Sequence, residues 1–178
     1  MDSEHFYFIA AMLEKIDTDS ALPSLLEAMY KPFSVFKPVP ANKNKINNEK
    51  LRYALLKELL DGGKDLSASE FKHIFAYCGG NINVTFNELN LLIKNNADIS
   101  STDPEGRNAL FHLCLAVSEN SDFFNDSNNL DAACDRAEFL LYKNIKTAPD
   151  TNDISNMKLH PDFEAIPGIK NLRRKHGK

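Results

Sequence analysis

Apolar residues recur every three or four positions along most of this chain, which is the spacing of a helix that buries one face. Two such stripes near the start share this spacing: Phe6, Ile9, Ala10 and Leu13 form the first, and Leu22, Leu25, Leu26 and Met29 form the second. The apolar–polar alternation of a half-buried strand is absent. We therefore predict an all-α protein in which antiparallel helix pairs lie side by side.

One pattern of apolar and polar residues occurs twice in the sequence, with a period of about 33 residues. The stretch from Leu56 to Ser67 reappears as Leu89 to Ser100, with the same order of apolar helix, helix exit and short polar segment. Gly63 and Asn96 stand at the two helix exits, where Gly or Asn tolerates a left-handed backbone conformation. A fixed period of this size indicates stacked units, none of which can bury its apolar face alone.

The second copy continues into a turn and another helix. Asp103-Pro104-Glu105-Gly106 predicts a tight turn, and Asn108 can cap the helix that follows. The apolar side of that helix consists of Ala109, Leu110, Leu113 and Cys114. This order of elements resembles the ankyrin repeat, a stacked helix-turn-helix unit. The resemblance implies an ankyrin-like solenoid whose function is to recognise another protein.

The resemblance also implies which residues contact the partner. Turn tips and first helices form the binding surface of such stacks. The variable positions of the best copy are Pro104, Glu105, Arg107, Leu115 and Ala116, with His112 at the border of the same face. The alternative interpretation is that each of these residues simply belongs to a solvated turn.

The other copies depart from the pattern. A third copy, Ala137 to Thr147, begins later than one period after the second, and the surplus predicts a polar loop inserted near 118–130. The segment from Asp65 to Phe71 is too short for a full turn, and Phe111 stands where the family usually has a histidine. We therefore expect about two and a half degenerate repeats across residues 48–155.

These patterns divide the chain into three parts: an N-terminal helical cap or extension at 1–41, degenerate repeats at 42–155, and a C-terminal extension with a basic tail at 156–178. Prolines at 32, 38 and 40 end the first part, and the polar stretch 42–48 predicts a linker. The first part is expected to cover the open end of the stack, because terminal units need a different outer face. An independent binding domain is the alternative.

Composition limits the location of the protein. No apolar run is long enough to cross a bilayer, so we expect no membrane span. The acidic start Met1–His5 does not match a secretory signal. The 3 cysteines form no disulfide framework, which indicates a reducing compartment. We expect a cytoplasmic monomer, with delivery into a host cell without a classical signal peptide as the alternative.

Charge is unevenly distributed along the chain. The formal net charge is −4, yet the final nine residues carry +5. Such a tail can contact nucleic acid or anionic lipid, or serve as an address, whereas the plainer interpretation is a solvated, disordered terminus. Because the remainder carries about −9 and has no basic stripe with interleaved aromatic residues, we expect no nucleic-acid partner.

Candidate chemistry is sparse. Two His–Cys pairs suggest a zinc site or a thiol nucleophile: His73 with Cys78, and His112 with Cys114. The C-x-x-C spacing is absent, however, and both thiols fall on apolar helix faces. Gly62-Gly63 and Gly79-Gly80 precede no Lys-Ser/Thr and fit helix ends rather than phosphate loops. We therefore expect no catalytic residue, no metal and no cofactor.

Two classes of function remain. The first is a non-catalytic protein–protein interaction module. Short ankyrin proteins rich in Asn and Lys resemble those of intracellular bacteria, so this class includes an effector that binds a host protein and an adaptor that stays in the cytoplasm. The second class is a small enzyme with its activity in the N-terminal helical region, residues 3–36, which no motif supports.

Overall fold

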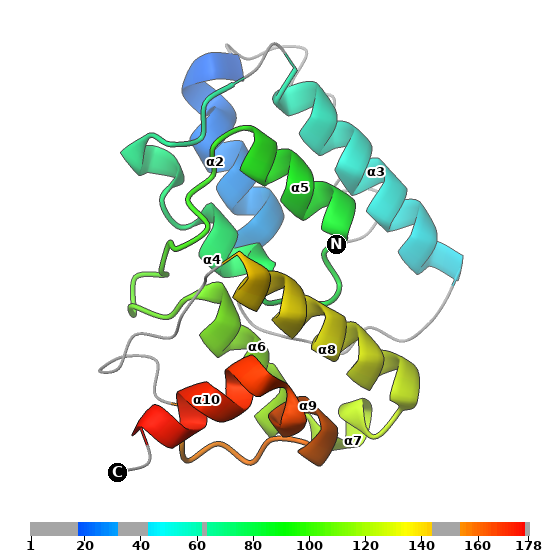
Figure 1. Ribbon diagram of the computed structural model, residues 1–178. Helices are drawn as coiled ribbons and strands as arrows, with labels where there is room; N and C mark the ends of the chain where they lie inside the picture. Colours follow the sequence, from blue (N-terminus) through cyan, green and yellow to red (C-terminus); the bar gives the residue numbers. More distant parts are fainter. Residues whose placement is uncertain (1–17, 32–42, 62–63, 144–153, 177–178) are drawn as a thin grey trace.

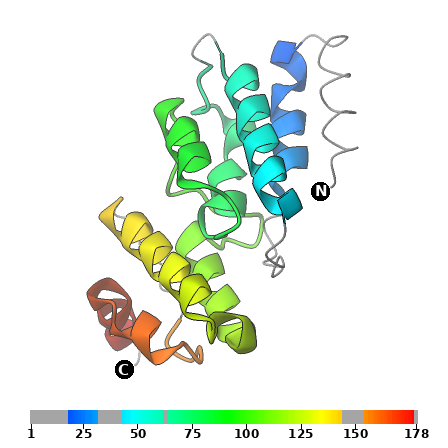
Figure 2. The ribbon, with the colours of Figure 1, turned by 90° about the vertical axis from the view of Figure 1, so that its right-hand side faces the viewer.

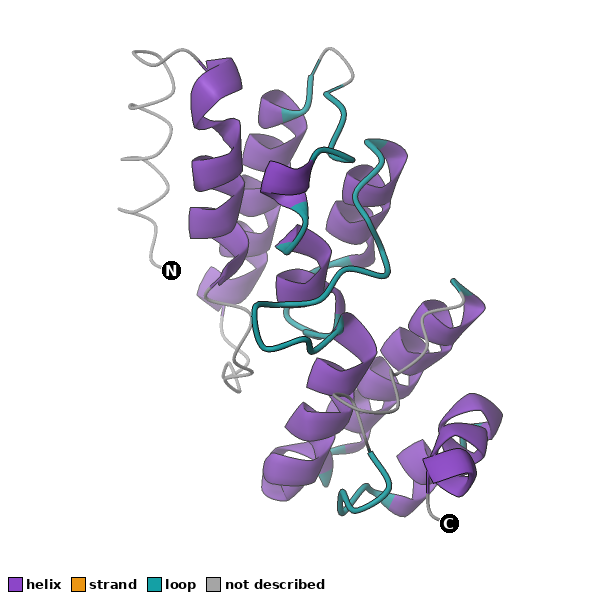
Figure 3. Cartoon of the chain, turned by 90° about the vertical axis from the view of Figure 1, so that its left-hand side faces the viewer, coloured by secondary structure: helices purple, strands orange, loops and turns teal. Residues whose placement is uncertain are grey.

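The structure, a computed structural model, describes residues 18–31, 43–61, 64–143 and 154–176. These residues are mostly helical and form no strand among themselves; Thr102 and Asn108 make one isolated antiparallel bridge. Figure 3 shows helices joined by loops. The all-α prediction is therefore confirmed for the described part of the chain.

The described helices follow in the order α2 (Thr18–Tyr30), α3 (Lys43–Leu59), the 3-10 helix η2 (Ser69–Phe71), α4 (Ile74–Gly79), α5 (Phe86–Lys94), α6 (Ala109–Glu119), α7 (Ser121–Phe124), α8 (Ser127–Tyr142), α9 (Pro161–Ala165) and α10 (Pro167–His176). Side-chain caps fix several of their starts. Asn108 caps α6, as predicted, and Asp126 caps α8. Such caps satisfy backbone N–H groups that have no partner inside the helix.

The longer helices form two layers. In the inner layer α2 packs against α4 and α4 against α6, while in the outer layer α3 packs against α5. Contacts between the layers join α2 with α3, α4 with α5 and α6 with α8. Figure 1 shows α3, α5 and α8 slanting across the view in nearly the same direction, and Figure 2 shows the helix pairs following one another along the molecule. At the C-terminal end, α9 and α10 pack on α8.

The core lies between these layers. Leucines of the repeat helices are buried there, among them Leu92, Leu110, Leu113 and Leu140, and so are Leu22, Leu26 and Met29 of the predicted stripe near the start. Leu25 of that stripe is only partly buried, and so is Ile93 in α5. Burying one such side chain contributes about 1.5–3 kcal/mol, so these residues supply much of the drive for folding.

Gly79 and Gly80 allow α4 and α6 to approach closely. The sequence predicts a helix end here, and α4 does end at Gly79, but Gly80 keeps an ordinary right-handed backbone with φ −84°. The requirement for glycine is one of space. A Cβ on Gly80 would lie 2.1 Å from the carbonyl oxygen of Ala109, and a Cβ on Gly79 would lie 2.8 Å from the Ala109 Cβ.

Arg136 of α8 is buried, at 2% exposed, and joins α8 to the loop between α4 and α5. Its guanidinium donates to the carbonyl oxygens of Gly79 at 2.9 Å and Asn81 at 3.1 Å, and to that of Val84. The guanidinium carbon also lies 4.7 Å from the centre of the Phe86 ring. Burial lowers the pKa of Arg136 to about 10, which leaves the side chain charged at neutral pH. The carbonyl dipoles therefore take the place of water around this cation.

A second buried cation joins α2, α3 and α5. Arg52 and Glu88 form an ion pair with Nε and Oε1 2.5 Å apart, and the two residues are 5% and 0% exposed. Tyr30 donates its hydroxyl to Glu88 Oε1 at 3.2 Å. The other oxygen of Glu88 accepts from the hydroxyl of Thr85 at 2.9 Å and from its N–H at 2.8 Å. The Thr-x-x-Glu spacing of this capping box is the sequence signal for part of the network.

Two predicted loops are helical instead. The polar stretch 42–48 contains the start of α3, because its lysines and asparagines include no proline or glycine to stop a helix. The predicted insertion near 118–130 contains α7 and the first turn of α8. There Phe124 and Leu130 are buried, so the polar residues that suggested a loop cover only the outer side of these helices.

The basic tail forms α10 as far as His176, which corrects the prediction of a disordered terminus. Ile169 is fully buried and holds the helix on the body. Arg173 donates to the carbonyl oxygen of Ser155 at 2.9 Å and pairs with Glu164 at 2.6 Å. An apolar anchor and a paired arginine therefore order a segment whose composition alone suggests a solvated tail.

Several predicted features lie outside the described residues: the stripe from Phe6 to Leu13, the prolines at 32, 38 and 40, Gly62-Gly63, and the third helix exit between Asn144 and Thr147.

Candidate partner-binding surface

The loops that precede α4 and α6 lie side by side on one edge of the molecule. They project on the left in Figure 1 and toward the viewer in Figure 3. Hydrogen bonds join them directly: Leu66 N donates to Asn95 O at 2.6 Å, Asn96 Nδ2 to Asp65 Oδ1 at 3.2 Å, and His73 Nδ1 to Thr102 O at 2.5 Å. Asn96 adopts the predicted left-handed conformation, with φ 64°.

The predicted turn at 103–107 is present. Gly106 N donates to Asp103 O at 2.9 Å, and Asp103 N donates to Arg107 O at 2.9 Å. The carboxylate oxygen Oδ1 of Asp103 also accepts from the backbone N–H groups of Glu105 at 3.0 Å and Arg107 at 2.9 Å. Gly106 has φ 79°, a left-handed conformation that favours glycine. Asp103 is thus the centre around which the turn closes.

Side chains of the turn and of α6 share the second oxygen of Asp103. Arg107 Nε donates to Asp103 Oδ2 at 2.8 Å, and Arg107 Nη2 donates to Glu105 Oε2 at 3.0 Å. His112 Nε2 lies 2.9 Å from the same Asp103 oxygen. The histidine that follows Phe111, rather than one at the position of Phe111, therefore bonds to the turn.

Electrostatics fix the charge states within this turn. Burial opposes ionisation of Asp103, but hydrogen bonds from the side chain and backbone of Arg107 bring the pKa of the carboxyl below its usual value. Burial lowers the pKa of His112, against the attraction of Asp103, so His112 is neutral at pH 7. Because a carboxylate only accepts, neutral His112 must carry its proton on Nε2.

Asp103→Asn is expected to lower the free energy of unfolding at pH 7 by about 1.5–3 kcal/mol, because charge-assisted hydrogen bonds are lost. The carboxyl has a lower pKa in the folded chain than in the unfolded chain. Its contribution is therefore present above about pH 4 and is lost as the pH falls through the folded value. Urea unfolding measured across this pH range should show that the difference in free energy of unfolding between wild type and variant becomes smaller at acid pH. A difference that stays constant with pH would contradict the ionic role of Asp103. Asp98→Asn, which changes an exposed carboxylate, is the matched control.

The structure distributes the predicted contact residues unevenly. Pro104 and Glu105 are exposed at the tip of the turn, and Arg107 is partly exposed with its guanidinium held by two carboxylates. His112 and Leu115 of α6 are also partly exposed. Ala116 is only 3% exposed and its methyl group lies in the core, so we leave it out of the candidate surface.

The surface beside the turn includes residues that the sequence does not single out. Glu27 and Lys31 at the end of α2 form an exposed pair, with Oε1 and Nζ 3.0 Å apart. The pKa of Tyr77 in α4 is raised by burial and then by the charge of Glu27, and the carboxylates of Asp103 and Glu105 add to this shift. We call the surface formed by Glu27, Lys31, Tyr77, Glu105 and Arg107 the inner face. No spacing signal links its parts, since α2, α4 and the turn meet only in the folded chain.

The thiol nucleophile that the two His–Cys pairs suggest has little physical support. Cys78 and Cys114 are both fully buried. Burial raises the pKa of Cys78 far above its usual value and that of Cys114 to about 12, so both thiols stay protonated at neutral pH. A protonated buried thiol behaves as a small apolar side chain rather than a nucleophile. Among the described residues, no three metal-ligating side chains of the His, Cys, Asp or Glu type come together.

Within the described residues, no helix combines the length and the apolar character needed to cross a bilayer. Comparisons of the chain with protein-family models, with curated proteins and with solved structures find no match.

Proposed function

We propose that this protein is a non-catalytic protein–protein interaction module of the ankyrin-repeat type. The helices group into the pairs α2–α3, α4–α5 and α6–α8, and the first members of these pairs pack in series. The loop that carries the exposed turn at 103–107 is joined to the start of α4, in the inner layer, by the hydrogen bond between His73 and Thr102. Surfaces of this kind, built from turn tips and first helices, are what stacked repeats use to bind partners.

The observation that carries the proposal is the register between neighbouring loops. The hydrogen-bonded partners His73 and Thr102 are 29 residues apart, and Asp65 and Asn96 are 31 residues apart. These separations are close to the period with which the sequence pattern of Leu56 to Ser67 is repeated at Leu89 to Ser100. Bonds at such separations are expected when each unit lies directly against the preceding one.

The packing of α2 extends this argument toward the N-terminus. The sequence predicts that residues 1–41 form a cap, but α2 pairs with α3 and packs against α4 in the same layer. This supports treating α2 and α3 as a complete first unit. The inner face then begins at Glu27 and Lys31 and continues through α4 to the turn.

The enzyme alternative has less support. It places an activity in residues 3–36, of which the structure describes 18–31. In that segment Leu22, Leu26 and Met29 are buried in the core, which is a structural role. An effector delivered to a host and an adaptor that stays in the cytoplasm would use the same surface, so only the origin of the partner separates them.

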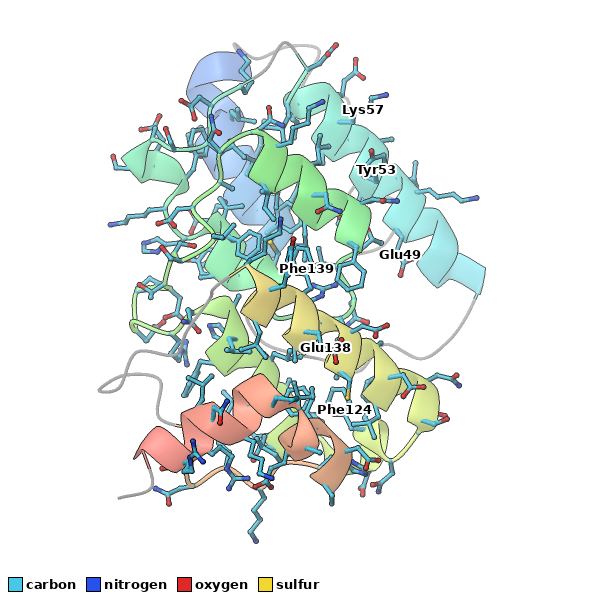
Figure 4. All side chains as sticks on the ribbon, in the orientation of Figure 1. Glu49, Tyr53, Lys57, Phe124, Glu138 and Phe139 are labelled. Carbon is cyan, nitrogen blue, oxygen red and sulfur yellow. The ribbon has the colours of Figure 1, made fainter. Side chains whose placement is uncertain are left out.

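Affinity capture with the intact chain, from a bacterial lysate and from a host-cell lysate, tests the proposal. The double variant Glu27→Lys/Glu105→Lys is expected to weaken binding of the captured protein at least about tenfold. A partner that is complementary to the two carboxylates would face two lysines in their place, and like charges that oppose one another are costly in an interface. The control variant Glu58→Lys/Glu138→Lys changes the net charge equally at exposed sites on α3 and α8. Glu138 lies on the opposite, outer layer (Figure 4).

The control variant should bind within about twofold of wild type, well below the roughly 1.4 kcal/mol that a tenfold change represents. The proposal would be contradicted by a partner whose binding falls with the outer-layer variant and not with the inner-face variant. Failure of the intact chain to retain any protein from either lysate would also contradict it.

A further inference from the structure

The carboxylate of Asp103 has five nitrogen atoms within 3.0 Å. Its Oδ1 accepts from the backbone N–H groups of Glu105 and Arg107. Its Oδ2 lies 2.8 Å from Nε and 2.7 Å from Nη2 of Arg107, and 2.9 Å from Nε2 of His112. A carboxylate offers about four acceptor positions, shared by its two oxygens. Arg107 and His112 therefore compete for one oxygen.

The two competitors differ in the alternatives open to them. Arg107 Nη2 also lies 3.0 Å from Oε2 of Glu105, and the Arg107 and Glu105 side chains are 35% and 62% exposed. The side chains of His112 and Asp103 are only 10% and 1% exposed. Arg107 can therefore leave Asp103 for Glu105 and solvent, whereas His112 is enclosed beside the carboxylate.

Protonation of His112 would change how the oxygen is shared. The neutral imidazole donates one N–H to Asp103, whereas the imidazolium adds a positive charge that makes this hydrogen bond stronger. The guanidinium of Arg107 and the imidazolium would then meet at the same oxygen, where their like charges repel. The pKa of His112 reflects these forces: burial lowers it first, the charge of Asp103 raises it, and the charge of Arg107 lowers it again.

Other helices also bring titratable groups toward α6. The helices α4, α7 and α8 pack against it, and their charged or titratable residues include Tyr77 and Cys78 of α4, Asp122 of α7, and Asp131, Asp135, Arg136 and Glu138 of α8. After burial, however, the leading influences on the pKa of His112 are Asp103, Arg107 and Glu105, all in the turn. A second histidine, His73, contacts the same loop through the carbonyl oxygen of Thr102.

We propose that His112 is a pH-sensitive switch that sets the partner of Arg107. While His112 is neutral, Asp103 holds the guanidinium of Arg107. Once His112 is protonated, its charged N–H takes over Oδ2 and the guanidinium moves to Glu105 and solvent. The switch operates below the usual histidine pKa of about 6.5 and above the lowered pKa of Asp103. As regulation of the inner face it rests on the proposed function, whereas the exchange of partners inside the turn does not.

Nuclear magnetic resonance of the intact chain tests the switch. The ring protons of His112 and the Nε–Hε signal of Arg107 are followed from about pH 7.5 to about pH 4.5, which spans the usual histidine pKa. The Arg107 signal is expected to shift with the same midpoint as the His112 ring. His112→Gln keeps a neutral N–H donor and cannot titrate, so the Arg107 signal should stay constant. His73→Gln, at the other histidine bonded to this loop, is the matched control and should leave the Arg107 midpoint unchanged.

Thermodynamic linkage supplies an independent check. If protonation of His112 displaces Arg107, then removing the guanidinium must make protonation easier. Arg107→Gln is therefore expected to raise the His112 midpoint by about one pH unit, a tenfold change in proton affinity. An Arg107 signal that titrates independently of His112, or that still shifts in His112→Gln, would overturn the inference. An unchanged His112 midpoint in Arg107→Gln would overturn it as well.

The captured partner enters only in a last measurement. The ratio of the affinities of wild type and His112→Gln for this protein should change about fivefold or more across the same pH range. A constant ratio would show that the switch does not regulate binding. If the two side chains titrate together but no protein is captured, the switch stands and the proposed function fails. If a protein binds the inner face while the side chains titrate independently, the proposed function stands and the inference fails.

Discussion

Gly80→Ala is expected to lower the free energy of unfolding by about 3 kcal/mol, at the upper end of the usual cost of overpacking. The added Cβ would lie 2.1 Å from the carbonyl oxygen of Ala109 and 3.0 Å from the backbone nitrogen of Leu113. Both are backbone atoms of α6, so relief requires α4 and α6 to move apart. For a chain of this size the melting temperature should fall by about 6–12 °C.

Gly168→Ala provides the matched control in α10. There an added Cβ would meet the Leu141 side chain, with Cδ1 at 2.5 Å, and a leucine side chain can change its rotamer. Alanine also favours the helix over glycine by about 1 kcal/mol, which offsets part of the strain. We expect a change below about 1 kcal/mol by thermal and urea unfolding. Similar losses for the two variants would show that the approach of α4 to α6 is not the source of the effect.

Glu88→Gln is expected to cost about 3–5 kcal/mol, because it leaves the buried guanidinium of Arg52 without its counter-ion. Glutamine has the size of glutamate and can still complete the capping box with Thr85, so the loss reports mainly on the missing charge. Urea unfolding at neutral pH measures this cost, provided that the free energy of unfolding depends on urea concentration with the same slope in the variant as in wild type.

The exposed pair of Glu27 and Lys31 supplies the comparison. Glu27→Gln removes one partner of an ion pair whose side chains are 47% and 63% exposed, and such pairs contribute about 0–1 kcal/mol. If Glu88→Gln cost no more than Glu27→Gln, the buried network would not join the layers as described. If the melting curve of Glu88→Gln were less cooperative than that of wild type, the substitution would instead have loosened the contact between α3 and α5.

Local signals in the sequence predict much of this fold. The apolar stripe of Leu22, Leu26 and Met29, the cap at Asn108 and the exit at Asn96 each act within a few residues. Such features depend on helix periodicity and on backbone conformation, which a single sequence contains. The turn at 103–107 is predictable for the same reason.

Other features depend on contacts between distant segments, which local patterns do not contain. Polar composition at 42–48 and 118–130 suggests loops, but α3 begins at Lys43, and the second stretch contains the end of α6, the whole of α7 and the first turn of α8. The role of Arg136 needs three carbonyl groups from another helix pair. Composition likewise suggests a disordered basic tail, although Ile169 docks α10 on the body.

The candidate surface is predictable only in part for the same reason. Glu105 and Arg107 belong to a recognisable turn, so the resemblance to a repeat is enough to select them. Tyr77 and Glu27 have no such signal, because their significance comes from α2 and α4 lying beside the turn. Ala116 fits the pattern of a variable contact position, yet the packing of α6 buries it.

The central claim is that the inner face, rather than the outer layer, binds a protein partner. Amide hydrogen exchange of the intact chain, alone and with the captured protein, measures this directly. Exchange is expected to slow at the end of α2, in α4 and in the turn at 103–107, and to stay unchanged on the outer sides of α3 and α8. The Glu27→Lys/Glu105→Lys variant should lose this protection at the same partner concentration. Protection confined to α3, α5 and α8, with exchange in the turn unaltered, would contradict the claim.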